Sequence, residues 1–256
     1  KISGTDSHPP ALRSEGFYEE HGIELLTGRE VVRLDPGDQV VELDDGSSLD
    51  YDAALLATGG RPRMLPVPGM DLENIFLLRS VEDADAIRAA IEDAMYAVVV
   101  GASFIGMETA AALTGRDVQV TVVAPESVPF ELSLGEEVGG VAQSLHEEKD
   151  VLFELGRTVS SFEGEENVVE DVVLDNADRV EADLVIVGVG VDPVTDYLEG
   201  IELNEDGSVP VDSHMRAADN LYAAGDIASF PNPQTGDPIR VEHWRLALQL
   251  GRVAAH

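Results

Sequence analysis

At 256 residues and 44% hydrophobic content, the chain can build one large or two ordinary domains with buried cores. Fifty Asp and Glu residues outnumber 16 Lys and Arg residues, and the formal net charge of −34 excludes a basic surface for nucleic acid. The absence of cysteine excludes disulfides and thiolate metal sites, the histidines show no metal-ligand spacing, and no apolar run approaches the length of a membrane span.

The first part of the chain alternates short apolar runs with turn residues, which is typical of short strands. In chain order the patterns predict a short helix at 14–20, strands at 23–26, 31–34, 39–43 and 53–57, and a helix at about 80–93. The strand at 53–57 ends in Ala57-Thr58-Gly59. Ser80 is expected to be the N-cap of the helix, because Asp83 stands at the reciprocal position of a capping box.

The stretch from residue 96 to 108 predicts a nucleotide-binding turn. An apolar run at 97–100 is typical of a buried strand, and Gly101, Ser103 and Gly106 then fall at the three glycine positions of a dinucleotide-binding motif. A helix at 107–113 and a strand at 118–123 would complete the strand–helix–strand unit. The helix N-terminus would then face a pyrophosphate. For the motif alone, a tight turn of another α/β protein is the alternative.

The residue that would select between NAD and NADP is not the usual one. An acidic residue is expected at the end of the second strand, where it would hold the adenosine ribose. Ala124 stands there, with Glu126 two residues later, and we expect no arginine beside it to bind a 2′-phosphate. We therefore expect an NAD(P) site with weak discrimination that favours NADH.

The rest of the chain returns twice to buried strands. The patterns predict a helix from Ser133, capped with Glu136, to about 149, strands at 151–155, 158–162, 168–174, 179–182, 184–187 and 221–223, and a closing helix near Glu242. The strand at 184–187 ends in Gly188-Val189-Gly190. The final strand ends in Ala224-Gly225-Asp226.

Three motifs, each after a strand, now stand in order: Ala57-Thr58-Gly59, the turn at Gly101, and Ala223 to Asp226. Their order and spacing resemble the FAD-dependent pyridine nucleotide-disulfide oxidoreductase superfamily. The stretch Glu242-His243-Trp244, with Gln249-x-Gly251-Arg252, is similar to its ferredoxin and rubredoxin reductase branch, which includes apoptosis-inducing-factor-like proteins. The resemblance implies an α/β fold of two Rossmann-like, three-layer domains. An NAD(P)-binding domain at 78–203 would be inserted between FAD-domain pieces at 1–77 and 204–256.

The resemblance also assigns roles to matching residues. For FAD it implies contacts from Val31, Ala57, Thr58, Gly59, Arg79, Gly225, Asp226, Glu242, His243 and Trp244. For NAD it implies contacts from Gly101, Ser103, Phe104, Ile105, Gly106, Glu108, Ala124 and Gly190. Glu108, near the nicotinamide, and Trp244, at the flavin's pyrimidine edge, are the candidates for catalysis. A solvated carboxylate is the alternative for Glu108, and a core tryptophan is the alternative for Trp244.

Two departures from the family pattern bear on FAD. The family's first glycine fingerprint, which grips the FAD pyrophosphate, would precede residue 1, and its C-terminal domain would follow residue 256. We therefore expect a fragment that holds FAD loosely or not at all. A lysine that often lies near the flavin would fall at about residues 1–4, where Gly4 takes its place, and a redox cysteine could lie upstream.

The resemblance implies an oxidoreductase that passes hydride from NADH to FAD and single electrons onward to a ferredoxin-like or Rieske-type acceptor. An NADH oxidase or a disulfide reductase of the same superfamily is the enzymatic alternative. A nucleotide-binding module without turnover is the non-enzymatic one. With two lysines and acid spread throughout, the composition predicts a halophilic, cytoplasmic protein, and it leaves a homodimer open.

Overall fold

The computed structural model describes residues 11–14, 16–116 and 118–256, so the expectation for residues 1–4 lies outside the described residues. The described chain forms two compact units: unit 1 contains residues 62–190, and unit 2 contains residues 11–61 and 191–256. One unit is thus inserted into the sequence of the other. These units divide the chain after residues 61 and 190, before the expected boundaries after residues 77 and 203. β6 (Ile75–Leu77) joins the sheet of unit 1, and β14 (Val191–Pro193) pairs with β5 (Gly60–Pro62).

Unit 1 is built around a five-stranded parallel sheet with the strand order β6-β13-β7-β8-β9. Its further strands are β7 (Tyr96–Val100), β8 (Gln119–Ala124), β9 (Leu152–Leu155) and β13 (Leu184–Val187). The helices that connect them are α2 (Val81–Ile91), α3 (Phe104–Thr114) and α4 (Glu131–Glu147). Between β9 and β13 the chain forms an antiparallel sheet of β10 (Val159–Glu165), β11 (Val168–Leu174) and β12 (Arg179–Glu181).

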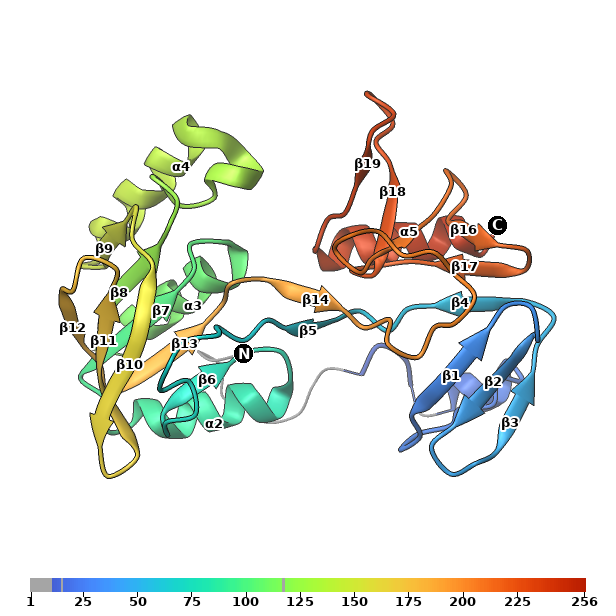
Figure 1. Cartoon of the computed structure of the whole chain (residues 1–256), viewed down its shortest axis with the longest axis horizontal. Coiled ribbons are helices and arrows are strands. Elements are labelled where there is room, and N and C mark those ends of the chain that lie inside the picture. The colour runs from blue at the N-terminus through green and yellow to red at the C-terminus, as the bar shows by residue number, and fades with distance from the viewer. Residues whose placement is uncertain (1–10, 15, 117) are drawn as a thin grey trace. The chain divides into compact units, whose positions relative to one another are not determined.

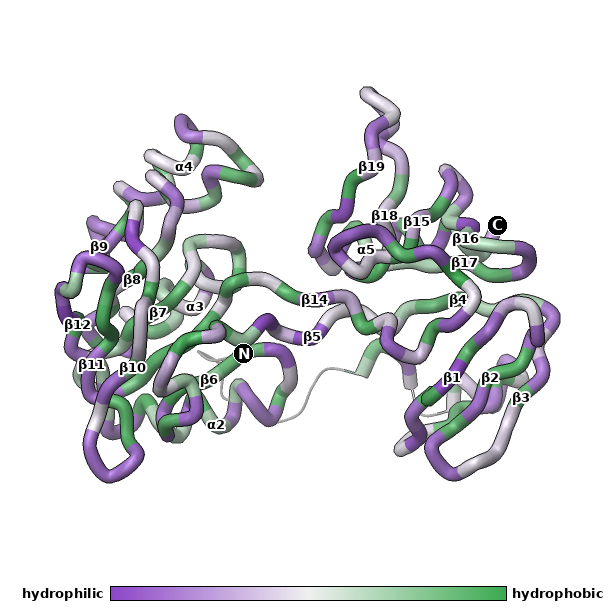
Figure 2. The backbone as a smooth tube through the Cα atoms, viewed as in Figure 1, coloured by the Kyte–Doolittle hydropathy of each residue, from purple (hydrophilic) through white to green (hydrophobic). Residues whose placement is uncertain are grey.

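The central strand β7 explains why unit 1 has three layers (Figure 1). Successive side chains of a strand point to opposite faces of its sheet. Ala97 and Val99 pack with α2 and α3, whereas Val98 and Val100 pack with β10 and β11. Both faces of β7 are therefore buried, which accounts for its continuous apolar run and its hydrophobic colour in Figure 2. The α/β fold class is confirmed.

The beginning of α2 matches the sequence prediction. The Ser80 hydroxyl accepts a hydrogen bond from the Asp83 N–H, and the Asp83 carboxylate accepts one from the Ser80 N–H at 2.7 Å. Two backbone donors that the helix leaves unpaired are thereby satisfied.

The predicted capping box of α4 is wrong. The helix begins at Glu131, and Gly135, with φ of +79°, interrupts it just where Ser133 and Glu136 were expected to form the box. The Ser133 hydroxyl instead donates to the Phe130 carbonyl. The first turn is held by the Glu131 carboxylate, which accepts from both the N–H and the hydroxyl of Ser127.

Besides the β14–β5 pair, the described residues of unit 2 form three small three-stranded sheets. Their orders are β1 (Val31–Asp35)-β2 (Val40–Leu43)-β3 (Ser48–Asp50), β16 (Arg216–Ala218)-β17 (Leu221–Ala223)-β4 (Ala54–Leu56), and β15 (Val209–Pro210)-β18 (Ala228–Pro231)-β19 (Pro238–Ile239). Two helices complete the unit, α1 (Phe17–Glu20) and α5 (Trp244–Ala254). The expected strand at 23–26 is wrong: these residues are exposed and pair with no described strand, so nothing stabilises an extended ladder there.

The core of unit 2 lies on the strands β4 and β17. Leu56 and Leu221 are buried there together with Leu34 of β1 and Ile227. A smaller apolar cluster beneath α5 includes Leu250 and Phe230. The sheet edge formed by β4 and β17 is therefore held from both sides.

Arginines in this acidic chain are shared between several carboxylates. Arg33 donates hydrogen bonds to Glu199 at 2.8 Å and to Asp38 and Glu42 at 3.0 Å, and these partners raise its pKa above the ordinary value. Figure 2 shows how hydrophilic the turns are, for example the one between β10 and β11. In the described part of the chain, every helix is too short or too polar to cross a bilayer.

The charge of −34 predicts strong dependence of stability on salt. The Debye length is about 30 Å at 0.01 M salt and about 3 Å at 1 M, so repulsion between surface carboxylates is long-ranged only in dilute buffer. We expect the melting temperature to rise steeply with KCl concentration, as measured by circular dichroism. A melting temperature that stays constant up to molar KCl would contradict the halophilic interpretation.

Candidate functional site

The carboxyl end of β7 forms a turn that requires glycine. Gly101 has φ of +110°, and a Cβ atom there would overlap the Gly188 carbonyl. Its N–H donates to the Val123 carbonyl at 2.8 Å, while the Gly188 N–H donates to the Val100 carbonyl at 2.7 Å. The ends of β8, β7 and β13 are thereby held together by backbone contacts.

This place is the topological switch point of the sheet. From β7 the chain moves through α3 to β8 on one side, whereas β13 lies on the other side of β7. Open parallel sheets bind ligands at such points, outside the carboxyl ends of the strands.

Helix α3 starts directly against the turn. A Cβ atom at Gly106 would overlap the Gly101 carbonyl, so only glycine allows the helix to approach β7 this closely. Ser103 is the N-cap, but its side chain makes no capping bond and donates to the Gly188 carbonyl at 3.4 Å. The first N–H groups of a helix have no partner within it. They are the groups with which Phe104, Ile105 and Gly106 would meet an anion.

The other predicted nucleotide residues line the same edge of unit 1. Gly190 has φ of +100°, and a Cβ atom there would have nothing within 4 Å, so its surroundings are open. Ala124 is buried, at 1% exposed. The Arg157 N–H donates to the Ala124 carbonyl at 3.1 Å, so the expectation that no arginine stands beside Ala124 is wrong. The reason is tertiary: β8 and β9 are parallel neighbours whose ends meet.

Glu108 lies on the exposed side of α3 and makes no hydrogen bond or ion pair with any residue of the described chain. This agrees with a solvated carboxylate. Its predicted place near a nicotinamide stays a prediction.

In unit 2, two of the predicted motifs leave the sheet at one edge. β4 and β17 are parallel neighbours, with Leu56 opposite Ala223. Ala57-Thr58-Gly59 and Ala224-Gly225-Asp226 therefore emerge side by side. The Thr58 hydroxyl donates to the Val194 carbonyl at 2.8 Å and lies 3.2 Å from the Tyr197 hydroxyl, which fixes the first loop.

The second loop lies beneath α5. Gly225 has φ of +84°, and a Cβ there would lie 3.6 Å from the Cβ of Ala247 in α5. His243 is the N-cap of α5, and its ring accepts from the Arg245 N–H. Trp244 stacks on the His243 ring and is 74% exposed, so the alternative of a core tryptophan is wrong.

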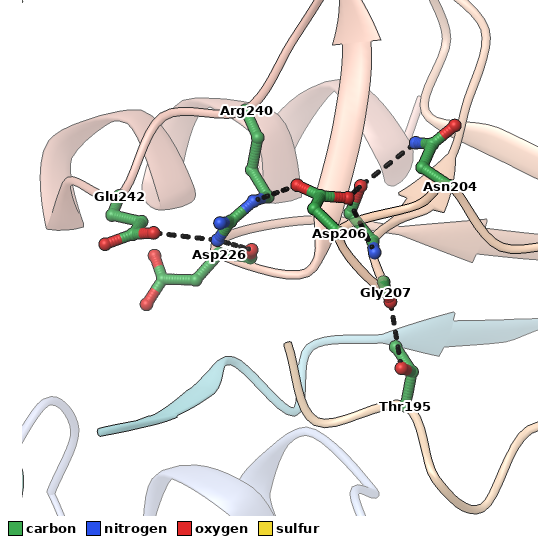
Figure 3. A network of polar contacts seen from close by, with 8 residues as sticks. Thr195, Asn204, Asp206, Gly207, Asp226, Arg240 and Glu242 are labelled. Atoms are coloured by element: carbon green, nitrogen blue, oxygen red, sulfur yellow. Dashed lines mark hydrogen bonds and ion pairs between the residues drawn. The ribbon is translucent and has the colours of Figure 1, made fainter. Parts of the chain in front are cut away.

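Arg240 connects the Asp226 loop to Asp206 and Glu242 and was missed in the sequence (Figure 3). Its guanidinium donates to Asp206 at 2.9 Å, to Glu242 at 2.8 Å, and to the backbone carbonyl of Asp226 at 3.3 Å. Partial burial opposes ionisation of Asp206, but hydrogen bonds from Ser208 and Arg240 outweigh it, so the pKa of Asp206 lies below its ordinary value. A lone arginine two residues before Glu242, in a chain poor in cations, was the available signal.

The remaining predicted FAD residues lie on different units. Val31, at the start of β1 in unit 2, pairs with Leu43 of β2. Arg79, in unit 1, is exposed and its N–H donates to Asp83 at 2.9 Å. Their contacts with FAD stay predictions.

Within the described residues, neither a metal cluster nor the one hollow described below coincides with the two loop edges. No group of three or more acidic or histidine side chains suited to a metal occurs within the described residues. An open hollow of about 690 Å³ lies between α4 and β9, and none of the predicted site residues lines it.

Comparison with known proteins gives consistent matches. The family model described as pyridine nucleotide-disulphide oxidoreductase matches residues 2–251. Apoptosis-inducing factor 3 of Homo sapiens is 38% identical over 100% of this chain and 43% of its own length. The ferredoxin–NAD(+) reductase component of the anthranilate 1,2-dioxygenase system of Burkholderia cepacia is 35% identical over 95% of this chain and 60% of its own length.

A solved structure extends the likeness to the fold. The ferredoxin reductase for the CYP199A2 system of Rhodopseudomonas palustris superposes with a TM-score of 0.92 at 29% identity, covering 99% of this chain and 63% of that one. The chain spans about half the length of the curated relatives it matches.

The glycine contact at the start of α3 can be tested by substitution. Gly106→Ala should lower the free energy of unfolding by about 1–3 kcal/mol, because the added methyl overlaps backbone that cannot move freely. The matched control is Gly140→Ala in α4, where nothing lies within 4 Å, and which should be neutral or stabilise by about 0.5–1 kcal/mol. Urea denaturation measures both, and equal stabilities would contradict the contact.

Proposed function

This chain belongs to the pyridine nucleotide-disulphide oxidoreductase family. We therefore propose that it functions in an FAD-dependent NAD(P)H oxidoreductase. Electrons would pass from NADH through FAD to a ferredoxin-like or Rieske-type acceptor. The observation that carries the proposal is the pair of glycine-rich loop edges, one in each unit, both at the carboxyl ends of parallel neighbours. Each edge suits one dinucleotide.

Unit 1 is proposed as the NAD(P)-binding domain. The N-terminus of α3 supplies unpaired N–H groups and the positive end of a helix dipole for the pyrophosphate. Gly101 and Gly106 let the backbone come close, and the open surroundings of Gly190 leave room for the nicotinamide end.

Unit 2 is proposed as the FAD-binding domain. Asp226, held from behind by Arg240 through its carbonyl, would accept hydrogen bonds from the ribityl chain. The exposed Trp244 and the N-terminus of α5 offer a flat apolar surface beside a positive dipole end, which suits the pyrimidine edge of a flavin. Bound FAD would itself supply the step from two-electron to one-electron transfer.

We propose an iron–sulfur protein as the electron acceptor, in part because this chain contains no pair of cysteines that could accept the electrons. Without cysteine, the 256 residues cannot carry the redox pair that small thioredoxin reductases place in their nicotinamide domain. The names of the ferredoxin reductases among the relatives support an iron–sulfur protein as acceptor. NADH oxidase activity is the second candidate, because an open flavin edge beside Trp244 would also admit oxygen.

Anaerobic reduction tests the proposal. With FAD added in excess, NADH should bleach flavin absorbance faster in the presence of this chain than in a protein-free blank, and a [2Fe-2S] ferredoxin should then be reduced. Asp226→Asn should slow bleaching by about tenfold, equivalent to about 1.4 kcal/mol. The matched control Asp219→Asn, in an exposed turn, should leave the rate unchanged.

Other outcomes would point to the alternatives. Peroxide formed in air in proportion to NADH, with ferredoxin left oxidised, would favour the oxidase. No bleaching above the blank would contradict an enzyme and favour a binding module.

The Arg240 network predicts a second effect on FAD. Arg240→Gln leaves the carboxylates of Asp206 and Glu242 without their shared cation and loosens the Asp226 loop. We expect FAD affinity to fall about tenfold, or about 1.4 kcal/mol, as measured by quenching of flavin fluorescence. Arg216→Gln changes the net charge equally at an exposed site and should cost less than about twofold. Equal losses in both variants would mean that only net charge matters.

A further inference from the structure

The adenosine end of the proposed NAD(P) site contains an unusual pair of charges. Ala124 ends β8 where a carboxylate would normally hold the ribose, and it is 1% exposed. Glu126 follows two residues later, and Arg157 lies just after the neighbouring strand β9. Two opposite charges therefore stand at the edge where an adenosine ribose would bind.

Three contacts fix the loop that carries Glu126. The Gly156 N–H donates to the Glu126 carbonyl at 2.9 Å, which ties the loop to the end of β9. The Phe130 N–H donates to the Ala102 carbonyl at 2.9 Å, which ties it to the glycine turn. The Phe130 ring also packs on Phe104, the first residue of α3, at 5.1 Å between centroids. The loop and the glycine turn therefore form one continuous surface.

Glu126 has an acceptor without a donor. Its side chain is partly buried, and Oε2 is shielded from solvent with no hydrogen-bond partner in the described chain. A buried acceptor that stays unpaired costs about 1–3 kcal/mol. A ligand that brings hydroxyl donors to this carboxylate would recover that cost, and a ribose diol is such a ligand.

Arg157 lies at the same edge, and its positive charge favours a 2′-phosphate, which the Glu126 carboxylate disfavours. The residue is partly buried, its backbone N–H donates to the Ala124 carbonyl, and its guanidinium forms no hydrogen bond or ion pair with a described residue. It also forms no ion pair with Glu126. A guanidinium presents several donors that match a phosphate. The site thus contains one group that repels a 2′-phosphate and one that attracts it.

Building on the proposed function, we infer that Glu126 replaces the missing carboxylate at position 124 as the acceptor for the adenosine ribose hydroxyls, and that Arg157 offsets its repulsion of a 2′-phosphate. The pair therefore sets the choice between NADH and NADPH. NADH is favoured by less than about tenfold, because the two charges oppose each other. In a site with only the carboxylate the phosphate would be rejected strongly.

Calorimetric titration of the full chain with ADP-ribose and with 2′-phospho-ADP-ribose tests this without FAD or turnover. Glu126→Gln should weaken ADP-ribose about fivefold and strengthen the 2′-phosphate form about fivefold. Arg157→Gln should weaken the 2′-phosphate form about tenfold and leave ADP-ribose within about twofold. The control Glu136→Gln, an exposed residue of α4, removes the same charge and should change neither ligand more than about twofold.

The outcomes separate this inference from the function on which it rests. If Glu126→Gln or Arg157→Gln leaves the ratio of the two affinities unchanged, while the wild-type chain binds ADP-ribose, the inference is overturned and the nucleotide site stands. If the wild-type chain binds neither ligand, the proposed nucleotide site fails as well. Melting temperatures equal to the wild type confirm that the variants are folded.

Discussion

The close backbone contact among Gly101, Gly106 and Gly188 is the constraint on which unit 1 depends. Side chains at the first two positions would overlap neighbouring carbonyls, so α3 reaches β7 only because these residues are glycine. With α3 in place, the alternate residues of β7 are buried on both faces, and the helix N-terminus faces the switch point of the sheet. The same glycine contacts therefore determine both the packing of unit 1 and its proposed binding of NAD(P).

In unit 2, the loops after the strands are positioned by ion pairs as well as by glycine. Its two loops leave the parallel pair β4 and β17 together, and Gly225 allows α5 to lie over one of them. The second loop is connected through its Asp226 carbonyl to Arg240, whose side chain is 15% exposed and is shared by Asp206 and Glu242. Because Arg240 also binds the Asp226 carbonyl, this cation contributes to the position of the proposed flavin ligand.

The charge balance limits how such a protein can hold anionic dinucleotides. With 50 acidic residues, two lysines and 14 arginines, cations are scarce, and Arg33, Arg179 and Arg240 each already bind more than one carboxylate. Phosphates must therefore be met mainly by backbone N–H groups and helix dipoles, which carry no competing carboxylate partner. Arg157 stands out against this background because, within the described residues, it is placed at the nucleotide edge without such a partner.

The sequence by itself determined what depends on neighbours in the chain: the buried strand β7, the glycine turn, the capping box at Ser80, and the strand ends at Thr58 and Asp226. Local periodicity and turn chemistry suffice there. The tertiary structure decided the rest. The start of α4 depends on the contact between Glu131 and Ser127 and on a glycine kink, and residues 23–26 found no described strand to pair with. Arg157 beside Ala124 and Arg240 beside Asp206 are contacts between residues far apart in sequence, which only the packing of β8 on β9 and of the loops in unit 2 brings together.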